Sequence, residues 1–188
     1  MKSRKSAILG DDMGIGKTVQ AIKAVEETGS FPLLVVCPKT VKQSWKAEFA
    51  KWSPNRTVAI VDGPKAKRSA QIRSGADAVL VNYEQLRIDE LELLKAKFGA
   101  VVFDEAHRIK NRKSKVFKSA CHLKARFPDA RFYFLTGTPI RNRAQEIWTM
   151  LHLIDKSRYG SYWKWVDQNF HSHDERYGRV TVRKIDGP

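Results

Sequence analysis

The sequence predicts an α/β fold in which a parallel sheet is covered by helices on both faces, giving a three-layer sandwich. Short apolar runs recur along the chain and do not alternate with polar residues, which is typical of strands buried on both faces. Segments with helical spacing lie between these runs, and repeated strand–helix–strand units build parallel sheets. The 188 residues are enough for one full-sized domain and too few for two of ordinary size.

The expected strands are built only from Ala, Val, Ile, Leu, Phe and Tyr. They are, in chain order, residues 7–9, 33–36, 58–61, 78–81, 101–103 and 132–135. The expected helices lie between or after these runs, at residues 17–27, 41–52, 83–97, 114–127 and 145–154. Ligands of such sheets bind beyond the carboxyl ends of the strands, so we expect the functional residues at strand-to-loop transitions.

The pattern weakens after Ile154 into an aromatic segment and a polar tail. We expect residues 1–158 to form one unit and residues 159–188 to extend it incompletely, as an aromatic helix followed by the tail. Trp163 and Trp165 could stack on exposed bases, but aromatic residues at helical spacing more often pack against a core. We expect core packing for both, and a short β-like run at residues 179–182.

The composition is that of an ordered globular protein, with 42% hydrophobic and 29% charged residues. No apolar run has the length of a membrane span, and no signal-peptide pattern follows the first residues, so we expect an intracellular protein without a membrane partner. Cys37 and Cys121 lie far apart and have no neighbours at metal-ligand spacing. They predict buried thiols rather than a disulfide framework or a zinc site.

Basic residues exceed acidic ones by 35 to 20, which gives a formal charge of +15. Such a charge attracts polyanionic partners over long range. A basic surface that only keeps the protein soluble explains the charge equally well.

A glycine-rich loop between the first strand and the first helix predicts a phosphate-binding site. Backbone N–H groups of such a loop can surround a phosphate at the positive end of the helix. We expect Lys17 to reach the β- and γ-phosphates of ATP and Thr18 to provide a ligand for Mg²⁺. The expected nucleotide-binding residues are Asp12, Met13, Gly14, Ile15, Gly16, Lys17 and Thr18. Asp11 replaces the first glycine of the general pattern, and a Gly-Lys-Thr turn alone could simply cap a helix.

Asp104 and Glu105 follow the expected strand at residues 101–103 and point to hydrolysis. One carboxylate can hold Mg²⁺ through its hydration shell while the next orients the attacking water. We assign the metal to Asp104 and the water to Glu105. An Asp-Glu pair after a strand is, on its own, more often a helix N-cap.

Five stretches occur together in one order: residues 11–18, 36–40, 81–84, 104–107 and 135–139. With its acidic pair followed by Met-Gly-Ile-Gly-Lys-Thr, and with Asp-Glu-Ala-His and Leu-Thr-Gly-Thr-Pro further along, the chain resembles the Swi/Snf-type ATPases. These are double-stranded-DNA translocases of helicase superfamily two. The resemblance implies a P-loop, RecA-like lobe that uses ATP and Mg²⁺. It also implies that His107 contacts the γ-phosphate and relays its state to Thr136, Gly137 and Thr138.

The resemblance further implies contacts with double-stranded DNA. Lys39 and Thr40, followed by Trp45, match the region where the family grips the phosphates of the tracked strand, without sequence preference. Arg108 and Lys110 begin a basic stretch after the acidic pair, for which we also expect a DNA role. Without the resemblance, a solvated helix start and a solvated charged loop would explain these residues.

The resemblance runs from about Ala7 to about Phe170 and covers the N-terminal lobe of a two-lobe motor. In the family, the second lobe supplies the arginine fingers, whose loss costs about a thousandfold or more in rate. We therefore expect this chain to bind ATP weakly and to need a second RecA-like lobe, in cis or in trans, for rapid hydrolysis. A strand-separating helicase lobe and a non-catalytic DNA- or partner-binding module remain alternatives.

Overall fold

The computed structural model describes residues 6–12, 14–137, 144–173 and 181–184. Its centre is a six-stranded, all-parallel sheet with the order β1-β6-β5-β2-β4-β3. The strands are β1 Ser6–Leu9, β2 Leu33–Cys37, β3 Val58–Ile60, β4 Ala78–Asn82, β5 Ala100–Asp104 and β6 Arg131–Leu135. All six expected strands are therefore present.

The strand that leads into the glycine-rich loop lies at one edge of the sheet. β1 pairs with β6, with Ser6 opposite Phe132 and Leu9 opposite Leu135. The other edge is the short strand β3, which pairs with β4. β5 and β2 are central, so Asp104, the last residue of β5, leaves the sheet near its middle.

Helices connect the strands and continue after β6. They are α1 Lys17–Glu27, α2 Lys42–Trp52, α3 Lys65–Ile72, α4 Tyr83–Ile88, α5 Glu90–Lys95, α6 Lys115–Arg126, α7 Trp148–Ile154 and α8 Tyr162–Asn169. Three short 3-10 turns precede or follow them: η1 Lys39–Val41, η2 Ala106–Ile109 and η3 Ala144–Ile147. An antiparallel hairpin follows α8, with strands β7 Phe170–His173 and β8 Thr181–Lys184.

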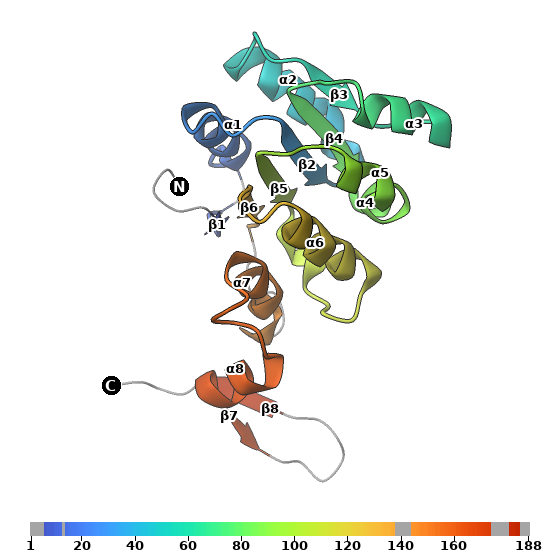
Figure 1. Cartoon of the computed structure of the whole chain (residues 1–188). Coiled ribbons are helices and arrows are strands. Elements are labelled where there is room, and N and C mark those ends of the chain that lie inside the picture. Colours follow the sequence, from blue (N-terminus) through green and yellow to red (C-terminus); the bar gives the residue numbers. More distant parts are fainter. Residues whose placement is uncertain (1–5, 13, 138–143, 174–180, 185–188) are drawn as a thin grey trace.

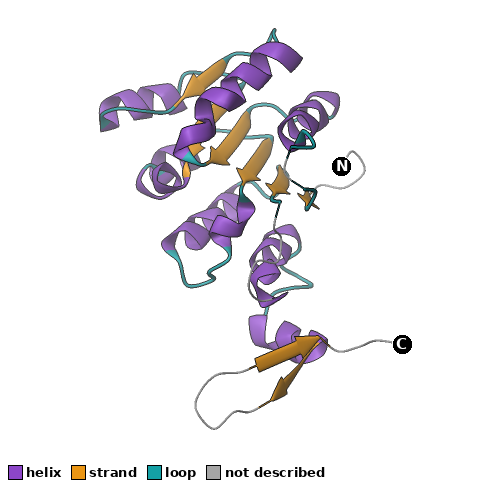
Figure 2. Cartoon of the chain, turned by 180° about the vertical axis from the view of Figure 1, so that it is seen from behind, coloured by secondary structure: helices purple, strands orange, loops and turns teal. Residues whose placement is uncertain are grey.

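The helices form a layer on each face of the sheet (Figure 2). α1 and α2 bury Ile22, Val25, Trp45 and Phe49 against one face. Helices α4 to α7 cover the other face, where the phenylalanines of β5 and β6 lie: Phe103, Phe132 and Phe134. All strands except β3 thus contribute apolar side chains to both cores, which explains why their sequences do not alternate.

Two helical segments differ from the sequence prediction. The helix expected at residues 83–97 is divided at Asp89 into α4 and α5. The Asp89 carboxylate accepts hydrogen bonds of 2.7 and 2.9 Å from the guanidinium of Arg68, so the break is fixed by a paired, buried side chain. Arg68 belongs to α3, a helix that the sequence did not predict. α3 is short and mostly polar, and Ile72 is its only buried residue.

The segment after α7 lies beyond the sheet (Figure 1). Trp165 of α8 is buried as expected, but Trp163 is 56% exposed, so core packing was a wrong prediction for Trp163. Residues two apart on a helix do not share a face, and only one of these two can point inward. Trp163 instead lies 5.6 Å from the guanidinium of Arg112, which also covers Tyr162 at 4.5 Å.

The cysteines match their prediction in part. Cys37 is fully buried, and burial raises the pKa of its thiol to about 12. Cys121 is only half-buried, and burial raises its pKa as well. Both free thiols are therefore protonated at neutral pH.

Candidate active site

The glycine-rich loop between β1 and α1 has the backbone that its glycines permit. Gly14 and Gly16 have φ values of 89° and 75°, which favour glycine because other residues are strained there. Gly16 is the N-cap of α1 and provides no side-chain hydrogen bond to the first turn, which also holds no acidic residue. The first N–H groups of α1 are thus left for an anion.

Lys17 is held by its own loop. Its ammonium donates hydrogen bonds of 2.8 Å to the carbonyl of Asp11 and 2.7 Å to the carbonyl of Asp12. Ile15 is 55% exposed, and Gly14 and Gly16 are exposed as well. The loop therefore presents its backbone to solvent while the lysine stays beside it.

Asp104 ends β5 and is fixed by two donors. Its Oδ2 accepts a hydrogen bond of 2.8 Å from Nε1 of Trp45, and its Oδ1 accepts one of 3.0 Å from the N–H of Glu105. Burial is the main reason why the pKa of Asp104 is raised, whereas the Trp45 hydrogen bond lowers that pKa. The carboxylate is therefore held in one orientation and partly shielded from solvent.

Glu105 adopts a left-handed conformation, with φ 54° and ψ 53°, and is the one non-glycine residue with positive φ among the described residues. Such strain concentrates at functional sites. Its Oε2 lies 3.1 Å from Nδ1 of His107, although the geometry makes no hydrogen bond. The backbone of the pair is held from α4, because the hydroxyl of Tyr83 donates to the carbonyls of Asp104 (2.6 Å) and Glu105 (3.3 Å).

One cavity of about 420 Å³ brings the loop and the acidic pair together. Its size is within the range of about 300–1,000 Å³ that small-molecule sites occupy. The lining residues are Gly14, Gly16, Lys17, Thr18, Val19, Ser44, Glu48, Lys51, Trp52, Asp104 and Glu105. The two motifs lie far apart in the sequence, on either side of β2 to β4, and the fold brings both to the lining of this cavity.

Several residues of this site were not predicted from the sequence. Trp45 was expected only beside the DNA segment, and no role was expected for Tyr83. Ser44, Glu48, Lys51 and Trp52 line the cavity because α2 packs beside α1. Trp45 and Phe49 are four residues apart in α2 and therefore share a face, but helical spacing does not tell which strand end that face meets.

The residues after β6 are described only in part. Thr136 is fully buried, and its N–H donates a hydrogen bond of 3.0 Å to the carbonyl of Leu9, beside the start of the phosphate loop. Gly137 follows it and is half-buried. Met13 and Thr138, which we also expected at the site, lie outside the described residues.

The four residues expected at DNA have different surroundings. Lys39 and Thr40 are exposed in η1, directly after the carboxyl end of β2. Arg108 is exposed, and its guanidinium lies 5.8 Å from the ring of Tyr83. Lys110 is half-buried in an ion pair of 2.9 Å with Glu146, so its charge is already neutralised.

Comparison with known proteins decides the family. Residues 1–185 match the family model described as the SNF2-related domain. The chain belongs to the SNF2-related family. Its fold agrees with that assignment, because the Sulfolobus solfataricus SWI2/SNF2 ATPase core in complex with dsDNA superimposes with a TM-score of 0.72 and 31% identity, over 86% of this chain and 34% of that one.

Relatives of this SNF2-related chain include much longer proteins. The CHD3-type chromatin-remodeling factor CHR7 of Arabidopsis thaliana is 32% identical over 179 residues, which cover 88% of this chain and 15% of the relative. The ISWI chromatin-remodeling complex ATPase ISW2 of Saccharomyces cerevisiae is 30% identical over 188 residues, which cover 93% of this chain and 16% of the relative. The chain spans about a sixth of the length of these relatives.

Within the described part of the chain, no group of three or more His, Cys, Asp or Glu side chains is placed to hold a metal ion. None of the described helices is both long and apolar enough to cross a membrane.

Proposed function

We propose that this SNF2-related chain is the ATP-binding lobe of a DNA-dependent ATPase that moves along double-stranded DNA when a second RecA-like lobe is joined to it. The observation that carries the proposal is that Lys17 and Thr18 of the phosphate loop line the same cavity as Asp104 and Glu105. Phosphate-binding and water-activating groups have to meet in this way for hydrolysis. We assign residues 1–158 to the lobe and residues 159–188 to an extension of it.

The donors in the cavity fit Mg²⁺. The Thr18 hydroxyl and the Asp104 carboxylate are the hard oxygen ligands that Mg²⁺ prefers, and Mg²⁺ keeps several of its waters when so few protein ligands hold it. Bound there, Mg²⁺ neutralises negative charge on the phosphate oxygens. We assign Thr18 as a direct ligand and Asp104 as a ligand through water.

The chain's own residues then have distinct tasks. Lys17 exchanges the carbonyls of Asp11 and Asp12 for the β- and γ-phosphates, since one ammonium cannot satisfy both sets. Glu105 accepts a hydrogen bond from the attacking water. This bond turns the lone pair of the water oxygen toward the γ-phosphate. His107, beside Glu105, relays the state of that phosphate to the turn at Thr136, Gly137 and Thr138.

We place double-stranded DNA beyond the carboxyl ends of the strands, at the same end of the sheet as the nucleotide cavity. Lys39 and Thr40 are exposed there and suit phosphate contacts, which give affinity without sequence preference. Arg108 is the better candidate of the basic stretch, because Lys110 already pairs with Glu146. The similarity to an SNF2 core that was solved with dsDNA supports duplex rather than single-stranded DNA.

The alternatives make different demands on the site. A non-catalytic module would not need Lys17, Thr18, Asp104 and Glu105 to line one cavity. A strand-separating helicase would need them equally, so the nature of the DNA substrate has to distinguish it. Preference for duplex over forked or single-stranded DNA supports translocation.

The test is nucleotide binding and ATPase activity of the 188-residue chain, with and without duplex DNA. We expect Mg²⁺-dependent ATP binding that Lys17→Ala abolishes, and slow hydrolysis that Glu105→Gln abolishes while binding persists. The hydrolysis rate should rise with duplex DNA only when a second lobe is supplied. Equal ATP affinity of the chain and its Lys17→Ala variant would contradict the assignment.

A further inference from the structure

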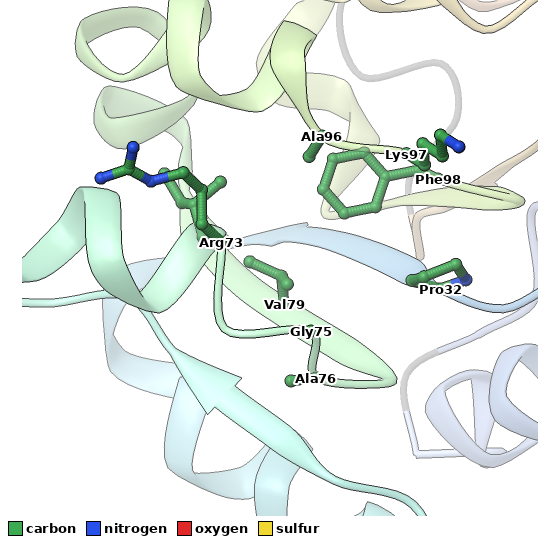
Figure 3. A pocket seen from close by; sticks show the side chains of 9 residues that line it. Pro32, Arg73, Gly75, Ala76, Val79, Ala96, Lys97 and Phe98 are labelled. Carbon is green, nitrogen blue, oxygen red and sulfur yellow. The ribbon is translucent and has the colours of Figure 1, made fainter.

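A second hollow lies at the amino-terminal ends of the strands, at the end of the sheet away from the nucleotide cavity (Figure 3). It has a volume of about 300 Å³ and lies where β2, β4 and β5 begin, whereas the phosphate loop and acidic pair lie where strands end. The lining residues are Pro32, Ile72, Arg73, Gly75, Ala76, Val79, Ala96, Lys97 and Phe98. The proposed ATPase activity uses none of them.

The floor of the hollow is apolar and preformed. Ile72, Val79 and Phe98 are 3%, 2% and 6% exposed, so their positions are fixed by the core beneath them. The ring of Phe98 also packs edge-on against Phe127, with 5.6 Å between ring centroids. A bulky apolar side chain gains free energy when it leaves water to lie on such a floor. A phosphate or a sugar gains nothing there, because the floor offers no polar partner.

Cations stand at the two ends of the hollow. Arg73 follows α3 and Lys97 follows α5, both are exposed, and Figure 3 shows them on opposite sides of the apolar floor. The carboxylate near Arg73 is that of Glu92, at 3.7 Å, and Glu92 is also paired with Lys95 at 2.9 Å. Cations therefore outnumber carboxylates around the hollow.

We propose that this hollow binds a peptide segment of a partner protein in which one bulky apolar side chain is flanked by Asp or Glu. The apolar side chain covers Val79 and Phe98, and the flanking carboxylates reach Arg73 and Lys97. Charge complementarity selects an acidic partner, and the formal charge of +15 speeds its approach. Because the hollow and the nucleotide cavity lie at opposite ends of the strands, the partner can stay bound while ATP is bound and hydrolysed.

The test is fluorescence anisotropy of a labelled peptide, Gly-Asp-Asp-Phe-Asp-Asp-Gly, with the 188-residue chain. Two control peptides carry Ser in place of Phe, or Asn in place of every Asp. We expect the parent peptide to bind at least tenfold more tightly than either control, and its affinity to fall as salt is raised. Equal binding of the Ser peptide would overturn the proposal, because it would show attraction by charge alone.

Variants of the chain locate the site. Arg73→Glu combined with Lys97→Glu reverses both charges, and we expect at least a tenfold loss of peptide affinity. Lys115→Glu combined with Lys118→Glu makes the same change in charge on the exposed side of α6 and should leave most of the affinity in place. Ala96→Leu fills the hollow without changing its charge and should also prevent binding.

Nucleotide binding provides the control for folding, since all of these substitutions lie outside the ATP cavity. A variant that keeps its ATP affinity and loses the peptide supports the proposal. Peptide binding that survives both the charge reversal and Ala96→Leu would overturn it. Displacement of the peptide by duplex DNA at equal charge concentration would also overturn it, by showing that the surface belongs to nucleic acid.

Discussion

The indole Nε1 of Trp45 donates a hydrogen bond of 2.8 Å to Oδ2 of Asp104, across 59 residues of sequence. Trp45 belongs to α2, which follows directly on the 3-10 turn that carries Lys39 and Thr40. A side chain of the proposed DNA-contact segment thus touches the carboxylate proposed to hold Mg²⁺. Any shift of α2 changes the surroundings of that carboxylate without moving β5.

Trp45→Phe tests this relationship, because it keeps the buried ring and removes the N–H donor. A hydrogen bond to a charged group is worth about 1.5–3 kcal/mol, so we expect Mg·ATP affinity to fall about tenfold or more. Binding of ATP without Mg²⁺ should change little. The measurement is titration with a fluorescent ATP analogue at several Mg²⁺ concentrations.

Trp52→Phe is the matched control for Trp45→Phe. Trp52 lies in the same helix and lines the same cavity, and its Nε1 donates a hydrogen bond of 2.9 Å to Glu48. It is 37% exposed, and its indole N–H goes to Glu48 rather than to Asp104. If both variants weakened the Mg²⁺-dependent binding equally, the Trp45 contact would have no special role.

Nucleotide binding should depend on pH through Asp104. Burial raises its pKa above the ordinary value of 3.8, so the carboxyl takes up its proton at a higher pH than a solvated Asp does. A protonated carboxyl does not bind Mg²⁺ or its waters, so the Mg²⁺-dependent part of ATP affinity should be lost as pH falls through that raised pKa. Titrations between about pH 7 and pH 4 measure the midpoint.

Asp104→Asn isolates that group. It cannot ionise, so the Mg²⁺-dependent part of ATP affinity should be small at every pH. An acid midpoint that persists in this variant would assign the effect to another residue.

Gly16→Ala should weaken the phosphate loop by backbone strain alone. Gly16 has a φ of 75°, and nothing lies within 4 Å of an added Cβ, so no clash contributes. A left-handed conformation costs other residues about 1–2 kcal/mol, so we expect a lower free energy of unfolding and weaker ATP binding. Chemical denaturation and nucleotide titration measure the two effects.

Gly29→Ala separates those two effects. Gly29 has a φ of 60° and equally open surroundings, but it follows the far end of α1. It should lose similar stability and keep its ATP affinity. A parallel loss of ATP affinity would mean that stability, rather than the loop, controls binding.

Asp89→Ala should be among the more destabilising substitutions outside the site. Asp89 is 3% exposed and forms two hydrogen bonds with Arg68, so its loss leaves a shielded guanidinium without its partner. Because the carboxylate side of this pair is buried, we expect the denaturation midpoint of the variant to fall clearly below that of the parent chain. Asp62→Ala removes one partner of the solvent-exposed Lys67–Asp62 pair and should leave the denaturation midpoint almost unchanged.

The strands and the phosphate loop could be predicted from sequence because their signals are local. Apolar runs mark β1 to β6, and α1 has the predicted bounds because glycines stand at both its ends. The missed helix α3 has a different cause. It is short and mostly polar, only its Ile72 is buried, and its anchor is the long-range pair of Arg68 with Asp89.

The contacts within the candidate site could not be predicted from the sequence. Short motifs pointed to Lys17, Asp104 and Glu105, and the fold brings these three residues to one cavity. The donors that hold Asp104 and Glu105 are aromatic residues of α2 and α4, and an aromatic residue in a helix predicts burial rather than a hydrogen bond. Burial keeps the pKa of Tyr83 well above its ordinary value, so that its hydroxyl remains a donor.

The pairing of β1 with β6 constrains the order in which the lobe can form on the ribosome. Ser6 is made early, but its neighbour in the sheet is Phe132, whose N–H donates to the Ser6 hydroxyl across 126 residues. At about 5–20 residues per second, β1 waits roughly 6–25 s for that neighbour. The strand that leads into the phosphate loop is therefore among the last to dock, and a nascent chain gains its nucleotide site only when the sheet is nearly complete.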